Sequence, residues 1–118
     1  MKTFSIILPL DNEYLTTVRL TTGGVCALAG FDVESTEDFK VCVTESLLLL
    51  KRSGFASARI AYTVDEPLLC EVVGEDRTCE KQTGVEDEIS FALLQALLGA
   101  VDYEKDEDGD VVAVRFNA

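Results

Sequence analysis

The alternation of apolar and polar residues along the 118-residue chain predicts eight helices and strands. The longest pattern covers residues 35–54, where apolar side chains recur at the spacing of one helical face. Ser35 is expected to cap this helix, with Asp38 answering it in a capping box, and Gly54 is expected to end it. Apolar residues occupy most of its circumference, so we expect it to lie across a sheet, with the charged residue Glu45 in its middle.

Two further helices and five strands are predicted on either side of this central helix. The first helix follows a cap at Asp11 or Asn12 and ends at Gly30, and the third covers residues 89–100. The strands are expected at residues 4–10, 58–64, 68–73, 101–104 and 111–116. This order predicts a single α+β domain over residues 1–118. We expect a two-layer α/β sandwich, with three helices on one face of a mixed, mostly antiparallel sheet.

The charge balance is strongly acidic and limits the classes of partner. The chain has 22 Asp and Glu against 10 Lys and Arg, a formal net charge of −12. Such a surface repels phosphate backbones and anionic membranes, so we expect neither nucleic-acid nor membrane binding. We expect the contact surface of a protein partner to be basic or neutral. Alternatively, the excess of acidic residues serves only to keep the protein soluble. The apolar run at residues 4–10 is too short to span a membrane and lacks a cleavage site, which predicts a soluble, cytoplasmic protein.

The four cysteines do not form a metal-binding pattern. They are Cys26, Cys42, Cys70 and Cys79, and no two are closely spaced as in zinc sites. The chain contains no histidine, which removes the usual general base and the usual serine or cysteine triads. We therefore expect no metal site, and we expect Cys26, Cys42 and Cys70 to be small core residues.

An acidic segment precedes the third helix, at residues 75–87. Its carboxylates are compatible with two interpretations, a calcium-binding site or a solvated loop that contacts a basic partner. Calcium loops place oxygen ligands at regular intervals around a glycine turn, and this segment lacks both. The solvated loop is therefore the favoured interpretation.

Several segments, in their order and spacing, resemble one known family. They are residues 13–20, 29–31, 36–46, 93–97 and the last hairpin. The chain resembles the bacterial anti-sigma-factor serine kinases of the GHKL, or histidine-kinase-like ATPase, superfamily. The resemblance implies the histidine-kinase-like ATPase fold, here with a shortened ATP lid. It also implies a homodimer that holds a sigma factor inactive and phosphorylates an anti-anti-sigma factor on serine, using ATP and magnesium.

Three positions depart from the pattern of that family. The family places a magnesium-binding asparagine four residues after the helix glutamate, and here Glu45 is followed by Leu49. A hydrocarbon cannot coordinate a hard cation. The family's Asp-x-Gly motif, which holds adenine, is matched by Glu75-Asp76-Arg77, so that a long side chain stands where glycine gave room.

The third departure concerns phosphate. The family has a Gly-x-Gly turn at the start of the last helix, whose backbone amides face phosphate. The matching residues here are Glu88-Ile89-Ser90. Both glycines are replaced, and a carboxylate is placed where phosphate would lie, which adds repulsion to crowding.

These departures favour a pseudo-kinase that binds a sigma factor or an anti-anti-sigma factor without using ATP. Glu45 is then a partly exposed carboxylate paired with a nearby Lys or Arg, and no cofactor is needed. The first alternative is an active serine/threonine kinase, with Glu45 as catalytic base and with ATP and Mg²⁺ as cofactors. The second alternative is an interaction module of a larger assembly. Arg19 lies where the resemblance implies partner binding, and its alternative role is a solvated helix arginine.

Overall fold

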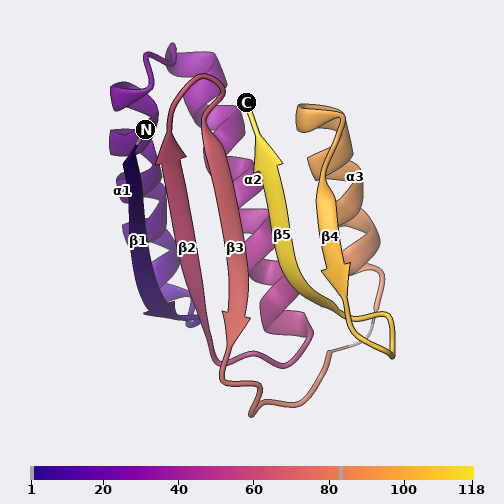
Figure 1. Cartoon of the computed structure of the whole chain (residues 1–118). Coiled ribbons are helices and arrows are strands. Elements are labelled where there is room, and N and C mark those ends of the chain that lie inside the picture. The colour runs from indigo at the N-terminus through magenta and orange to yellow at the C-terminus, as the bar shows by residue number, and fades with distance from the viewer. Residues whose placement is uncertain (1, 83) are drawn as a thin grey trace.

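Five strands form one sheet in the order β1-β2-β3-β5-β4, and three helices cover one of its faces (Figure 1). This computed structural model describes residues 2–82 and 84–118, so Thr83 of the predicted acidic segment lies outside the described residues. The elements are β1 (Lys2–Pro9), α1 (Glu13–Leu28), α2 (Val33–Arg52), β2 (Ser57–Val64), β3 (Leu69–Glu75), α3 (Glu86–Leu98), β4 (Asp102–Lys105) and β5 (Val111–Asn117). The predicted α+β class, element order and one-sided helix layer are confirmed.

The sheet is antiparallel in every pair that the structure describes, so the expected mixed sheet is wrong. Short turns join β2 to β3 and β4 to β5, and each of these turns reverses the direction of the chain. The two long connections, from β1 to β2 and from β3 to β5, contain the helices and also join antiparallel strands. Helices α1 and α2 return the chain antiparallel to β1, and α3 with β4 places β5 antiparallel to β3.

Helix α2 crosses the middle of the sheet, as its pattern predicted (Figure 1). Its apolar face is buried through Phe39, Cys42, Val43, Leu47, Leu49 and Leu50. The predicted cap is wrong. Asp32 caps the helix by accepting a hydrogen bond from the Ser35 amide at 2.8 Å, so the helix begins at Val33 and Asp38 forms no capping box. Gly54 follows the helix with φ +98°, the conformation expected of it.

The other predicted boundaries shift by a few residues. Asn12 stands at the start of α1 but makes no side-chain cap bond, and its Oδ1 accepts a hydrogen bond from Lys51 Nζ at 3.0 Å instead. Strand β3 extends to Glu75. Helix α3 begins three residues earlier than predicted, because the acidic residues before Ile89 suit the positive end of the helix dipole.

The core lies between α2 and the inner face of the sheet. Cys26, Cys42 and Cys70 are buried in it, as predicted, and burial raises the pKa of the Cys26 thiol to about 11 and that of Cys42 to about 12. Such thiols stay protonated and unreactive at neutral pH. Among residues 2–82 and 84–118, none of the helices combines the length and apolar composition needed to cross a membrane.

Candidate functional site

The glutamate and the serine singled out in the sequence meet between α2 and α3. Ser90 Oγ donates a hydrogen bond to Glu45 Oε1 at 2.8 Å. Ser90 is fully buried and Glu45 is half-buried. The fold therefore brings together two residues that lie 45 positions apart in the chain. The expected pairing of Glu45 with a lysine or arginine is wrong, since its partner is a hydroxyl group.

Arg52 completes this network from the last turn of α2. Its guanidinium donates to Ser90 Oγ at 3.1 Å and to Asp87 Oδ1 at 2.6 Å. The Ser90 hydroxyl thus donates to one side chain and accepts from another, which satisfies a buried polar group. We call Glu45, Arg52, Asp87 and Ser90 the interhelical network. It fixes the first turns of α3 against the last turns of α2.

Replacing Ser90 by alanine is expected to lower the free energy of unfolding by about 1–3 kcal/mol. The change leaves the half-buried carboxylate of Glu45 without its donor and removes one acceptor of Arg52. Urea denaturation of the purified protein measures the loss. Gln95→Ala, at an exposed position of the same helix, is the control and is expected to change stability by less than about 0.5 kcal/mol. Equal effects of the two substitutions would contradict a structural role for the network.

Leu49 lies one turn after Glu45, and its side chain is fully buried in the core. No oxygen or nitrogen atom of this side chain is available for a cation, and its methyl groups pack among apolar neighbours. The position that the resemblance assigns to magnesium is therefore part of the hydrophobic core.

Arg77 crosses from the segment after β3 to the turn between β4 and β5. Its Nε donates to the Ser53 carbonyl oxygen at 3.0 Å, and its two terminal nitrogens contact Asp106 at 2.5 Å and Asp110 at 3.3 Å. The guanidinium also lies over the Phe55 ring, 5.1 Å from its centroid. These contacts engage the side chain at the position to which the resemblance assigns the glycine of an adenine-binding motif.

The remaining position of that motif, Glu75, lies at the end of β3. Its carboxylate is 3.9 Å from Arg59 Nε, on the face of the sheet that carries no helix. It therefore takes no part in the contacts around Arg77 and does not approach Glu45 in the interhelical network.

Three aspartates form the acidic cluster that the sequence analysis missed. Carboxylate oxygens of Asp106, Asp108 and Asp110 lie within 4.8 Å of one another. Their alternate spacing was the signal that would have found them. Arg77 and Lys81 already contact the cluster, with Lys81 Nζ 2.5 Å from Asp110, and the Arg77 hydrogen bond lowers the pKa of Asp106. Two cationic side chains thus neutralise much of the charge that would attract a metal ion.

Glu88 and Arg19 stand apart from the interhelical network. Glu88 is exposed in the first turn of α3, and Arg19 is exposed on α1. Within the described ranges, no ion pair includes Arg19. Its guanidinium remains accessible to a partner.

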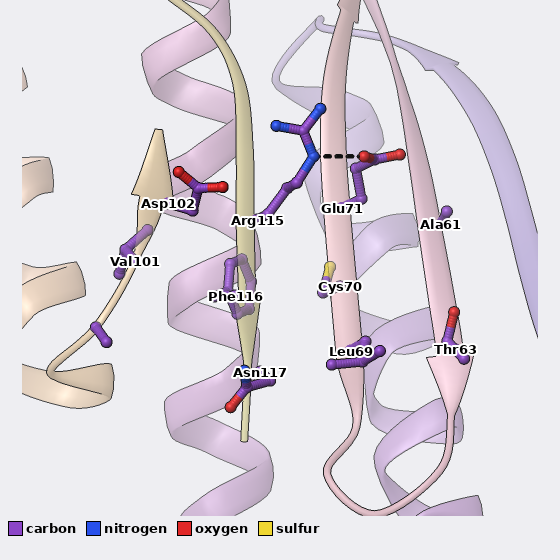
Figure 2. A pocket seen from close by; sticks show the side chains of 11 residues that line it. Ala61, Thr63, Leu69, Cys70, Glu71, Val101, Asp102, Arg115, Phe116 and Asn117 are labelled. Carbon is purple, nitrogen blue, oxygen red and sulfur yellow. Dashed lines mark hydrogen bonds and ion pairs between the residues drawn. The ribbon is translucent and has the colours of Figure 1, made fainter. Parts of the chain in front are cut away.

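The open face of the sheet carries a shallow hollow of about 620 Å³, which Figure 2 shows between β2, β3 and β5. Ala61 and Thr63 give it a floor of small side chains. Beside it, Arg115 Nε donates to Glu71 Oε2 at 2.6 Å and a terminal nitrogen donates to Glu104 at 3.1 Å. These bonds raise the pKa of Arg115. Because the arginine already has two carboxylate partners, its positive charge is paired and offers little to an anionic ligand in the hollow.

Comparison with known proteins does not assign the chain to a family. No model of a known protein family matches it, and no curated protein matches it significantly. Its function is therefore argued from its own residues and their contacts.

Proposed function

We propose that this protein is a non-catalytic regulator that resembles an anti-sigma factor and binds a sigma factor or an anti-anti-sigma factor without using ATP. One observation carries the proposal. The residues at positions that would handle a nucleotide are engaged in contacts within the chain. The finer fold description, a histidine-kinase-like ATPase domain with a shortened lid, is part of the same proposal.

The contacts that support it differ at each position. Glu45 would be the base of a kinase, but it accepts a hydrogen bond from buried Ser90. Leu49 gives magnesium no ligand, and Arg77 is held by three oxygen acceptors where adenine would need space. Each group would have to leave a satisfied arrangement before nucleotide could bind. The residues present therefore do not fit ATP and Mg²⁺.

Binding to a protein is supported by the surface. The chain carries a net charge of −12, and exposed Arg19 lies on α1, where the resemblance implies partner contact. We infer a partner whose contact surface is mostly basic. Within that surface, it would carry one site that binds the side chain of Arg19. Electrostatic attraction of this kind speeds association and weakens as salt rises.

Calorimetry with Mg²⁺-ATP and with ADP, at millimolar nucleotide, tests the proposal first. We expect no binding heat and no shift in the melting temperature under the same conditions. Saturable binding would overturn the proposal and would support the first alternative, an active kinase with Glu45 as base. Glu45→Gln, followed by a phosphate-transfer assay, would then distinguish catalysis from mere binding.

Titration against purified sigma factors and anti-anti-sigma factors tests the partner. We expect one of them to bind, and we expect Arg19→Ala to weaken that complex. Thr16→Ala is the control, since Thr16 is also exposed on α1 and is uncharged. Failure of every factor to bind would leave the second alternative, an interaction module of another assembly.

A further inference from the structure

Helix α3 carries an apolar face that is open to solvent. The face consists of exposed residues, most of them spaced one helical turn apart: Val85, Ile89, Leu93 and Leu97, with Ala92 and Ala96 beside them. We call these residues the α3 face. Between Glu88 and Asp102 the chain carries no charged side chain. The exposed side of α3 is therefore apolar along most of its length.

The other side of α3 packs against the domain. Leu94 and Ser90 are fully buried there, and the Phe91 ring contacts the Tyr103 ring of β4, with 5.0 Å between the two centroids. A helix at the margin of a domain normally has a polar outer side, and a helix that is apolar all round is normally enclosed. Helix α3 lies at the margin of the helix layer, beside α2 (Figure 1). Contiguous apolar surface at such a position marks an interaction site.

Helix α2 borders the α3 face with carboxylates. Arg52 contacts Asp87 at the start of α3, and Glu45, two turns earlier on α2, contacts Ser90. The two helices therefore run antiparallel, as Figure 1 shows. Asp38 lies a further two turns before Glu45 on the same line of α2, so it borders the end of α3. Both carboxylates are half-buried.

Glu86 and Glu88, both exposed, add negative charge at the start of α3. Together with the two carboxylates of α2 they form the border carboxylates, which are Asp38, Glu45, Glu86 and Glu88. Within the described ranges, none of the ion pairs includes a border carboxylate. A cation, Lys105, lies on the side of α3 toward β4, with Nζ 5.6 Å from the centroid of the Phe91 ring. The border toward α2 is thus acidic from the start of α3 to its end.

The border carboxylates distinguish between the possible occupants of the α3 face. A second copy would bring the same carboxylates to the interface. Two α3 helices packed in parallel would place Glu86 and Glu88 beside their counterparts, and two packed antiparallel would place them near Asp38 of the other copy. Both arrangements are repulsive, and anionic lipid is repelled for the same reason. A helix with basic residues beside its apolar side is attracted instead.

We propose that the α3 face binds an amphipathic helix of a partner protein, with lysine or arginine residues of that helix on the border carboxylates. Helix α3 has 13 residues, or about 20 Å, which is enough for several turns of such a helix. The face lies on the other side of α2 from α1, which carries Arg19 (Figure 1). It is therefore a contact surface additional to the one proposed around Arg19, and the inference holds whether or not the proposed function does.

Calorimetry of the full chain with synthetic peptides tests the binding. The first peptide has about 18 residues, with leucines on one side of its helix and lysines along the border of that side. The second has the same residues in scrambled order, and the third has glutamate in place of lysine. We expect the first to bind about tenfold or more tighter than the second, and the third not to bind. The scrambled peptide keeps the charge, so it measures the attraction that is due to charge alone.

Ile89→Lys tests whether the peptide occupies the α3 face. Ile89 is 57% exposed, so the domain accommodates a lysine there, and the new charge repels the lysine-bordered peptide. We expect binding of the first peptide to weaken by about tenfold or more. Leu28→Lys is the matched control, since Leu28 is 77% exposed in the last turn of α1 and its substitution changes the charge equally. We expect it to leave binding unchanged, and urea denaturation checks that both variants fold.

A second variant tests the border carboxylates without changing an apolar contact. Glu86→Gln combined with Glu88→Gln should weaken binding of the first peptide by about threefold or more and should lower its salt dependence. Glu13→Gln combined with Glu66→Gln is the control, because it removes as many exposed carboxylates from the start of α1 and from the turn between β2 and β3. We expect this control to have a smaller effect.

Three results would overturn the proposal. One is equal binding, or equal failure to bind, of the first and the scrambled peptide. Another is an equal effect of Ile89→Lys and Leu28→Lys on binding of the first peptide. The last is self-association of the chain that Ile89→Lys abolishes, which would assign the α3 face to a second copy. Since the peptides contain no sigma factor, these results are independent of the test of the proposed function.

Discussion

Replacing Leu49 by asparagine is expected to lower the free energy of unfolding by roughly 3–5 kcal/mol and to create no binding of Mg²⁺-ATP. The substitution supplies the amide that the kinase family uses at this position. However, the leucine side chain is fully buried among apolar neighbours. The change removes apolar contacts and buries an amide among apolar side chains, so both terms are unfavourable.

Urea denaturation and calorimetry of the same variant separate the two parts of this prediction. Val33→Asn is the control, because it introduces the same amide into α2 at a position that is 82% exposed. Its effect should stay within about 0.5 kcal/mol. A Leu49→Asn variant that is as stable as the control, or that binds Mg²⁺-ATP, would mean that position 49 still faces a nucleotide site.

The sequence predicted the element order well because periodicity depends on burial, and burial is consistent along each element. Helix α2 buries Leu47 and Leu50 as its spacing indicated. Periodicity does not identify the residue that makes a cap. Ser35 and Asp32 are both good caps, and the hydrogen bond from the Ser35 amide to Asp32 decides between them. Such choices depend on backbone angles that a pattern does not contain.

Helix α3 shows a second limit of the pattern. Leu93, Leu94 and Leu97 all belong to its apolar pattern, and the pattern alone does not distinguish which of them is buried. The structure buries Leu94 and leaves the other two exposed. A helix at the end of a layer has a neighbour on one side only, and its position in the layer is a property of the topology. Sequence spacing cannot supply it.

The candidate site was predicted in its residues but not in its contacts. Resemblance selected Glu45 and Ser90 separately, and the fold joins them through a hydrogen bond. Arg52 lies in the last turn of α2, where a cation suits the helix dipole, and it also donates hydrogen bonds to Ser90 and Asp87. The long-range partner of a polar side chain depends on how α2 and α3 pack. For this reason the spacing of residues in the sequence does not reveal the interhelical network.

Replacing Gly54 by alanine is expected to lower the free energy of unfolding by about 3 kcal/mol or more. Gly54 has φ +98°, and a side chain costs about 1–2 kcal/mol in left-handed backbone. In addition, a Cβ atom would lie 2.7 Å from the Cys79 carbonyl oxygen. The Cys79 amide donates to the Gly54 carbonyl at 2.9 Å, so the backbone cannot move apart without losing this bond.

Gly30→Ala separates the two causes. Gly30 has φ +80°, but a Cβ atom there would meet nothing within 4 Å, so its substitution should cost only about 1–2 kcal/mol. Chemical denaturation of both variants measures the difference. Amide exchange at Cys79 and Gln82 should also quicken in Gly54→Ala alone, because Gln82 donates to the Arg52 carbonyl at 2.8 Å in the same segment. Equal losses in the two variants would mean that the close approach of Cys79 to the end of α2 contributes nothing.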